Sequence, residues 1–298
     1  MNPNDLSTKS ENTWCPGCPN HMILASVKQT ISDLITKQNK TVHQRSGLTS
    51  TSEAVNQRSG LTKEDFAITT DIGCHAKIFD YLNLSGIYCL HGRALPTGIG
   101  MKLGNPNLKL LTFVGDGAMY AEGMEHFVHA FKYNTDMTLI LHDNQSFSLT
   151  TGQPTPTTQT GYVSKASPLG TFDKPFNPLK LALAANATFI ARVSARDMKH
   201  MQEVFTKAIQ HKGFSFVEVI QDCLIFNLES NTKDSRMYKI KDNKDKSIAE
   251  KLTNEYDYNT KDGKIPMGII YQSAEPTLEE KWPQLNKLIK SKSYWKNK

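Results

Sequence analysis

Two oxygen-bearing side chains, 28 residues apart, have the types and positions needed to hold a metal ion. Asp116 stands between Gly115 and Gly117 directly after one apolar run, and Asn144 lies at the end of a second. A carboxylate and an amide carbonyl suit Mg²⁺, which takes few protein ligands and completes its octahedron with phosphate oxygens and water. The two glycines let the backbone approach a phosphate group closely. The pattern therefore indicates a magnesium–diphosphate site, although glycine and aspartate are also ordinary turn residues.

Four of the five cysteines could form a second site. Cys15 and Cys18 form a C-x-x-C motif, and Cys74 and Cys223 each follow a strand-like segment. Four thiolates suit either a tetrahedral Zn²⁺ ion or a [4Fe–4S] cluster, and their spacing alone leaves both open. A single buried cysteine is more often a small apolar core residue, and we assign that role to Cys89.

The segment from Lys109 to Gln145 must position Asp116 and Asn144. It contains an apolar run rich in strand-forming residues, an amphipathic stretch and a second apolar run, Met137 to Leu141. The apolar side chains of the amphipathic stretch recur at helical spacing: Met124, Phe127, Val128 and Phe131. Strand, helix and strand in this order predict one βαβ unit with a right-handed crossover. Neighbouring parallel strands bring Asp116 and Asn144 to the same carboxyl edge, and the helix that begins near Tyr120 directs its positive end there.

The remaining pattern predicts an α/β fold, a mostly parallel sheet with helices on both faces. Further strands are expected at 66–72, 87–90, 188–193 and 214–220, with an edge strand at 265–271. Helices are expected at 22–36, from Ala94 to Gly104, and at 179–187 and 194–211. Ser194 and Asp197 would form a capping box at the start of the last of these helices. Because parallel strands end at one edge, this topology can bring Cys74 and Cys223 next to Asp116.

The chain is expected to have two parts. Residues 1–228 would form the cofactor-binding domain, and residues 229–298 would be an extension that packs on this domain or on a partner subunit. A loop insertion is expected at 37–63, where QRSGLT occurs twice. Residues 150–178 contain five prolines and no apolar period, which favours an active-site cover or a subunit contact. The last 25 residues are interpreted as an extended arm.

Composition argues against a protein embedded in a membrane. Of 298 residues, 38% are hydrophobic, mean hydropathy is −0.45, and the apolar runs are too short to span a bilayer. The first residues lack the basic and apolar regions of a signal peptide, so we expect a cytoplasmic protein. Net charge is +6, but no basic stripe interleaved with aromatic residues indicates nucleic-acid binding. We interpret the lysines from Lys287 onward as a solvated terminus, with attraction of an acidic partner as the alternative.

The Gly115–Gly117 motif followed by Asn144 resembles the thiamine diphosphate motif. A wider resemblance, to the β subunit of 2-oxoacid:ferredoxin oxidoreductases, is carried by three stretches: 14–18, 71–74 and 91–158. It covers about residues 12–228 and a patch at 263–271. The resemblance implies a thiamine diphosphate-binding fold and oxidative decarboxylation of a 2-oxoacid, either 2-oxoglutarate or pyruvate, to acyl-CoA and CO₂. Electrons would pass through a [4Fe–4S] cluster to ferredoxin.

The resemblance also implies site residues. Thiamine diphosphate would be contacted by Ile72, Gly73, Cys74, His75, His91, Gly92, Gly115, Gly117, Ala118, Ser148 and Leu149. Mg²⁺ would be held by Asp116, Asn144 and the main-chain carbonyl of Ser146, and the cluster by Cys15, Cys18, Cys74 and Cys223. His91 would be the catalytic residue, as a donor to a phosphate or to the substrate carboxylate. The plainer alternative for His91 is a histidine whose hydrogen bonds are satisfied by the backbone.

A partner chain is implied as well. Thiamine enzymes need a glutamate to activate the aminopyrimidine, normally from a second domain for which this chain has little room, so we expect an α subunit to supply it. Thr151 stands where many relatives carry lysine, which leaves the substrate open. Two alternative functions are a non-oxidative thiamine diphosphate decarboxylase or synthase and a non-catalytic, zinc-stabilised nucleotide-binding module.

Overall fold

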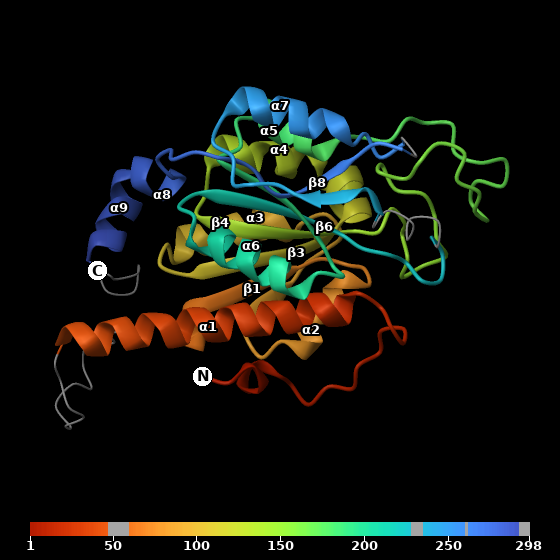
Figure 1. Ribbon diagram of the computed structural model, residues 1–298. Helices are drawn as coiled ribbons and strands as arrows, with labels where there is room; N and C mark the ends of the chain where they lie inside the picture. The colour runs from red at the N-terminus through yellow and green to blue at the C-terminus, as the bar shows by residue number, and fades with distance from the viewer. Residues whose placement is uncertain (47–59, 228–234, 260–261, 292–298) are drawn as a thin grey trace.

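The centre of the molecule is one eight-stranded sheet. The computed structural model describes residues 1–46, 60–227, 235–259 and 262–291, and its strand order is β2-β1-β3-β4-β6-β5-β8-β7 (Figure 1). The strands are β1 (Phe66–Thr70), β2 (Ser85–Tyr88), β3 (Lys109–Gly115), β4 (Met137–Asp143), β5 (Phe189–Ser194), β6 (Phe214–Ile220), β7 (Met237–Lys239) and β8 (Ile265–Gln272). All neighbouring strands are parallel except β5 and β8. The predicted α/β fold with a mostly parallel sheet is confirmed.

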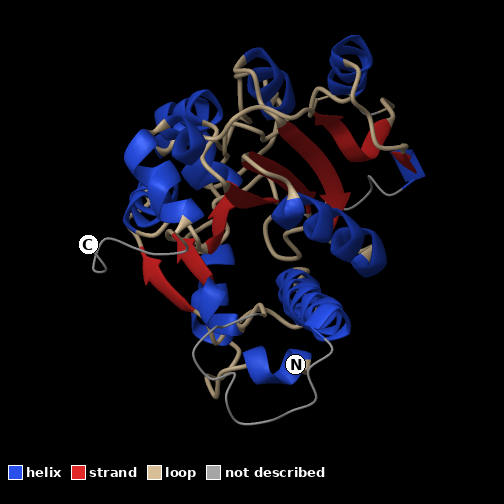
Figure 2. Cartoon of the chain, turned by 90° about the vertical axis from the view of Figure 1, so that its left-hand side faces the viewer, coloured by secondary structure: helices blue, strands red, loops and turns tan. Residues whose placement is uncertain are grey.

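Helices cover both faces of this sheet (Figures 1 and 2). One apolar layer is formed with α1 and α6, and the opposite layer with α3, α4, α5 and α7. The α-helices are α1 (Asn20–Ser46), α2 (Ile78–Tyr81), α3 (Ala94–Gly104), α4 (Met124–Tyr133), α5 (Pro178–Ala184), α6 (Met198–Gln210), α7 (Lys246–Glu255), α8 (Leu278–Lys281) and α9 (Pro283–Lys290). Short helical turns add η1 (Pro3–Leu6), η3 (Lys63–Asp65), η4 (His75–Lys77) and the π-helical turn η5 (Ala118–Glu122).

The predicted βαβ unit is present as β3, η5, α4 and β4. Every residue of β4, and all but the first of β3, is buried, as expected for strands covered on both faces. The register pairs Gly115 with His142. Asp116 therefore follows β3 at the same level at which Asp143 ends β4, and Asn144 comes one residue later. This pairing delivers the predicted oxygen ligands to one edge.

Four sequence-based expectations are wrong. Helix α1 continues to Ser46, so it occupies the first part of the segment 37–63 that was expected to be a loop, while 47–59 lie outside the described residues. The strand β8 pairs with β5 on one side and β7 on the other, so β8 is not an edge strand.

The other two errors concern the start of α6 and the C-terminal segment. Asp197 alone caps α6, accepting a hydrogen bond from the main-chain N–H of His200, while Ser194 ends β5. The supposed C-terminal arm forms the short helices α8 and α9 in its described part, because Leu285 and Leu288 bury one side of an otherwise polar segment.

The connection from β4 to α5 has no helix or strand, and it projects beyond the sheet on the right of Figure 1. Its outer part leaves three large apolar side chains in solvent: Val163 is 65% exposed, Leu169 86% and Phe172 81%. Two main-chain hydrogen bonds hold its two limbs together, from the N–H of Gly161 to the carbonyl of Thr171 and from the N–H of Thr171 to the carbonyl of Tyr162. An ordered segment with exposed apolar side chains is typical of a contact surface. Within the described chain, no helix is long and apolar enough to cross a membrane.

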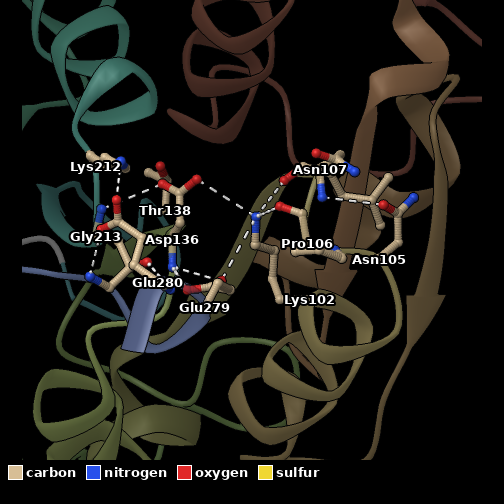
Figure 3. A network of polar contacts seen from close by, with 12 residues as sticks. Lys102, Asn105, Pro106, Asn107, Asp136, Thr138, Lys212, Gly213, Glu279 and Glu280 are labelled. Atoms are coloured by element: carbon tan, nitrogen blue, oxygen red, sulfur yellow. Dashed lines mark hydrogen bonds and ion pairs between the residues drawn. The ribbon is translucent and has the colours of Figure 1, made fainter. Parts of the chain in front are cut away.

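A buried lysine connects the C-terminal helices to the sheet (Figure 3). Lys102, which is 0% exposed, donates to the carbonyls of Pro106 and Leu108 at 2.7 and 2.9 Å. Its ammonium lies 3.6 Å from Asp136 and 3.9 Å from Glu279 of α8. Both carboxyl oxygens of Glu279 also accept the main-chain N–H of Asp136. The network therefore ties the end of α3, the start of β4 and α8 to one buried cation.

Lys102→Met is expected to lower the free energy of unfolding by about 3 kcal/mol, because removing one member of a buried ion pair leaves the other charges uncompensated. Lys102→Met combined with Glu279→Gln should recover part of the loss. Lys212→Met, which removes an exposed lysine paired with Glu280, is the control and should change stability by less than about 0.5 kcal/mol. Urea unfolding of the three variants measures these differences. Equal effects of the two lysine variants would contradict the proposed role of burial.

Candidate functional site

A cavity of about 210 Å³ opens at the carboxyl edge of the sheet. Its walls come from the ends of β3 and β4 and from the residues that follow β1, β2, β3, β4 and β6, the position at which open parallel sheets bind ligands. The lining residues are Ile72, Gly73, Cys74, His75, His91, Gly115, Asp116, Gly117, Ala118, His142, Asn144, Ser146, Phe147, Ser148, Leu149, Thr150 and Gln221.

The residues that sequence reasoning assigned to thiamine diphosphate and Mg²⁺ all line this one cavity, with the exception of Gly92. The backbone of Gly92 lies behind the wall, where its N–H donates to Oδ2 of Asp71 at 3.1 Å. A Cβ atom on Gly92, whose φ is +69°, would lie 2.7 Å from the main-chain nitrogen of Gly123. Gly92 therefore supports the wall rather than forming it.

Four lining residues were missed: His142, Phe147, Thr150 and Gln221. His142 and Phe147 flank Asn144 in the same stretch of sequence, so proximity to the predicted ligand could have indicated them. Gln221 directly follows β6, and the edge argument that selected Asp116 applies to it equally. That argument was used for Cys223 but not for the residues between the end of β6 and Cys223.

Glycines allow two rings to form part of the cavity wall. A Cβ on Gly115 would lie 2.8 Å from Nδ1 of His75, and one on Gly117 would lie 2.4 Å from Cε1 of Phe147. His75 is fixed from behind, because its Nε2 lies 2.5 Å from Oδ1 of the buried Asp71. The Gly-Asp-Gly motif therefore serves close ring packing here as well as close approach of a ligand.

Asp116 is the buried carboxylate of the cavity, only 2% exposed. Its Oδ2 accepts hydrogen bonds from the hydroxyls of Thr155 and Thr157 at 2.5 and 3.0 Å. Burial raises the pKa of Asp116 to about 6, although these hydroxyls oppose the rise by favouring the charged form. A cation bound to the carboxylate would relieve the cost of burying its charge.

The other two predicted Mg²⁺ ligands lie in the turn after β4. Oδ1 of Asn144 accepts the main-chain N–H of Ser146 at 3.1 Å, and the carbonyl of Ser146 accepts the hydroxyl of Ser148 at 3.1 Å. Three polar atoms on the wall are buried and find no hydrogen-bond partner in the described chain: Nε2 of His142, Oγ of Ser146 and Oε1 of Gln221. A wall with carboxylate, amide and carbonyl oxygens and unpaired polar atoms fits a polar, metal-bearing ligand.

His91 stands at the rim, with a side chain that is 30% exposed. Its Nδ1 lies 2.9 Å from the carbonyl oxygen of Ile72, which can only accept, so Nδ1 carries the proton. Nε2 lies 3.4 Å from the carboxylate of Glu122. One ring nitrogen is thus satisfied by the backbone, as the plainer alternative expected, while the other remains near the cavity mouth.

The four cysteines other than Cys89 lie near one another. Cys74 experiences the charges of Cys15, Cys18 and Cys223, and Cys18 those of Cys15 and Cys223. Burial raises the pKa of Cys74 to about 11. We call Cys15, Cys18, Cys74 and Cys223 the cysteine quartet. Only Cys74 belongs to the cavity wall.

Local contacts bring the segments of the quartet together. The indole N–H of Trp14 donates to the carbonyl of Cys74 at 2.6 Å, and a Cβ on Gly17 would lie 3.4 Å from Leu224, next to Cys223. Nevertheless, no group of three or more His, Cys, Asp or Glu side chains within the described ranges is compact enough for a single metal ion. A four-iron cluster separates its cysteine ligands more widely than one ion does.

The parallel sheet, the edge cavity and the Gly-Asp-Gly motif define a thiamine diphosphate-binding enzyme domain. Residues 71–219 match the family model described as "Thiamine pyrophosphate enzyme, C-terminal TPP binding domain".

Curated relatives define the family more narrowly. The chain is 34% identical over 276 residues to the 2-oxoacid:ferredoxin oxidoreductase subunit beta of Saccharolobus solfataricus, covering 88% of this chain and 82% of the relative. It is 33% identical to the 2-oxoglutarate oxidoreductase subunit KorB of Mycobacterium tuberculosis, covering 75% and 53%. The solved 2-oxoglutarate:ferredoxin oxidoreductase of Magnetococcus marinus superposes with a TM-score of 0.83 at 26% identity, covering 99% of this chain and 92% of that one.

This chain belongs to the β subunits of the 2-oxoacid:ferredoxin oxidoreductases. It is an enzyme subunit of the oxidoreductase class, which excludes the non-catalytic zinc module considered from the sequence.

Proposed function

We propose that this chain carries the thiamine diphosphate site and one [4Fe–4S] cluster of an enzyme that oxidises a 2-oxoacid and coenzyme A to acyl-CoA and CO₂. The two electrons released would leave singly through the cluster to ferredoxin. One observation supports this proposal above the others: Cys74 is both a wall residue of the cavity and a member of the quartet. A non-oxidative thiamine enzyme has no need of four neighbouring thiols beside its cofactor.

The cavity residues have separate roles in this proposal. Asp116, Asn144 and the carbonyl of Ser146 hold Mg²⁺, and the glycines at 73, 115 and 117 admit the diphosphate. Thiamine diphosphate itself supplies the carbanion chemistry when bound. The chain contributes orientation and exclusion of water, and the half-exposed rim beside His91 admits the substrate.

His91 is proposed as the catalytic residue of this chain. Its Nδ1 proton is committed to the carbonyl of Ile72, which fixes the ring plane and leaves Nε2 to act. The carboxylate of Glu122 lies 3.4 Å from Nε2. Protonated Nε2 could donate to an anionic oxygen of the substrate or cofactor at the cavity mouth.

The relatives indicate the partners to test. The solved Magnetococcus marinus enzyme contains 2-oxoglutarate, coenzyme A and succinyl-CoA, so 2-oxoglutarate is the first substrate we propose, ahead of pyruvate. An α subunit would complete the cavity and supply the activating glutamate, and the exposed Val163, Leu169 and Phe172 form a suitable surface for a neighbouring subunit. We place this complex in the cytoplasm, without nucleic-acid partners.

The complex should reduce a viologen dye only when a 2-oxoacid and coenzyme A are both present. The chain is co-expressed with the proposed α subunit and purified without oxygen, and dye reduction is measured with 2-oxoglutarate, pyruvate and branched-chain 2-oxoacids. His91→Gln should lower kcat at least tenfold and leave the iron content unchanged, because the side chain of His91 lines the cavity and does not belong to the cysteine quartet. CO₂ release without dye reduction would instead support the non-oxidative alternative.

A further inference from the structure

His142, near the end of β4, links the cavity to the cysteine quartet. It is 1% exposed, it lines the cavity, and its ring packs against those of His75 and Phe113 at centroid distances of 5.8 and 6.2 Å. None of the roles proposed above uses this side chain. Its placement between two proposed cofactor sites raises the question of what its two ring nitrogens do.

The hydrogen bonding of the ring fixes its tautomer. Nδ1 lies 2.9 Å from Oδ1 of the buried Asn20, and an amide carbonyl oxygen can only accept. Nδ1 therefore carries the proton, and Nε2 of the neutral ring can only accept. Nε2 is buried and meets no donor from the described residues. A buried, unpaired acceptor on a cavity wall indicates that a molecule in the cavity supplies the donor.

Asn20 connects this ring to the first cysteine pair. It is the first residue of α1, two positions after Cys18, and its main-chain N–H lies beside the sulfur of Cys18. Two successive contacts of Asn20 thus join the cavity wall to one proposed cluster ligand. Hydrogen bonds to the ligand sulfurs are among the features that set the reduction potential of an iron–sulfur cluster.

We propose that His142 is a positioning residue that couples occupancy of the cavity to the reduction potential of the cluster. Its Nδ1–H holds Asn20 in place, and with it the N–H group on the sulfur of Cys18. Its Nε2 accepts a hydrogen bond from an N–H or O–H donor of the bound cofactor or of water held with it. That bond polarises the ring and strengthens donation from Nδ1, which tightens the hold on Asn20.

This coupling rests on the proposed function, because it needs both the cluster and the cofactor. It is also reciprocal: if the cofactor changes the cluster potential, reduction of the cluster must change cofactor affinity by the same factor. The two hydrogen bonds of His142 would therefore make the cavity's affinity for its cofactor depend on the oxidation state of the cluster.

The test is a redox titration of the co-purified complex, followed by cluster absorbance and electron paramagnetic resonance, with and without thiamine diphosphate and Mg²⁺. In the wild-type complex, the cofactor should change the ratio of reduced to oxidised cluster at a fixed potential at least threefold. In His142→Leu, the ratio without cofactor should fall at least threefold and the response to cofactor should disappear. His142→Asn, whose amide N–H can replace Nδ1–H, should keep the first ratio and lose only the response.

Several outcomes would overturn the coupling. One is a wild-type complex that holds both cluster and cofactor but whose ratio of reduced to oxidised cluster does not change when the cofactor is added. Another is a His142→Leu complex whose ratio responds to the cofactor as that of the wild type does. If His142→Leu fails to fold or loses its iron, Asn20→Ala removes the same contact without altering the cavity wall, and a wild-type ratio in that variant would equally refute the proposal. A wild-type complex without a cluster would refute the proposed function instead, and iron analysis separates the two failures.

Discussion

Asp116→Asn is expected to abolish Mg²⁺-dependent binding of thiamine diphosphate and, in the same variant, to stabilise the cofactor-free protein at neutral pH. The carboxylate is buried, with Oδ2 tied to Thr155 and Thr157, and asparagine can accept the same hydroxyl hydrogen bonds without a charge. What the substitution removes is the negative charge that Mg²⁺ requires. Affinity for the cofactor should fall by more than 100-fold, or about 3 kcal/mol.

The direction of the pH dependence follows from the raised pKa. Because the folded state raises the pKa of Asp116 from 3.8 to about 6, its neutral form is favoured by folding. The resulting stabilisation is complete below the unfolded pKa and is lost as the pH rises through about 6. At pH 7.5 the cofactor-free wild type therefore carries a cost of up to about 3 kcal/mol that Asp116→Asn does not.

Thermal unfolding at pH 5.5 and 7.5, with and without Mg²⁺ and thiamine diphosphate, measures both effects. Wild-type stability without cofactor should fall between the two pH values more than that of the variant, and only the wild type should be stabilised by adding the cofactor. Asp173→Asn is the control and should behave as wild type, because Asp173 is exposed, in the connection from β4 to α5 that also carries Thr155 and Thr157. Cofactor binding by Asp116→Asn at wild-type affinity would refute the assignment of the metal site.

Cys223→Ser is expected to remove the iron–sulfur cluster, whereas Cys89→Ser should retain it. The two cysteines are equally buried, each 8% exposed, but only Cys223 lies with Cys15, Cys18 and Cys74. The comparison therefore separates ligation from general loss of a buried thiol. Serine is a poor ligand for the soft iron–sulfur unit, so dye reduction should fall at least 100-fold while thiamine diphosphate still binds.

Iron and acid-labile sulfide in anaerobically purified protein measure this effect. About four of each per chain are expected in the wild type and in Cys89→Ser, and close to none in Cys223→Ser. Zinc without sulfide in the wild type would refute the cluster. An unchanged cluster spectrum in Cys223→Ser would show that another group occupies that ligand position.

Sequence reasoning reached the centre of the fold because that region has strong and mutually consistent signals. The apolar runs at β3 and β4, the amphipathic stripe of α4 and the glycines around Asp116 all favour one βαβ unit, and the carboxyl-edge rule then places the side chains that follow each strand. The same rule would have found Gln221 if it had been applied to every residue after β6. His142 carries no motif of its own, so its one sequence signal is its proximity to Asn144, and the register of β4 then fixes its position.

The errors lie where apolar patterning is weak. Residues 37–46 are polar and the end of α1 has no apolar side to mark it, so a helix there could not be distinguished from a loop. The antiparallel insertion of β8 beside β5 depends on a chain reversal that the sequence of β8 does not encode. In α8 and α9, the leucines that pack against the rest of the molecule stand among lysines, so the helical apolar pattern is weak in the sequence.

The buried ammonium of Lys102 also decides where this polypeptide can be shortened. Glu279 reaches that cation from α8, so a chain that stopped before residue 278 would leave Lys102 with Asp136 as its one acidic partner among the described residues and would uncover the start of β4. A truncation designed to remove the terminal lysines should therefore end after Lys290. That cut retains both docking helices and deletes only eight residues, from Ser291 to Lys298.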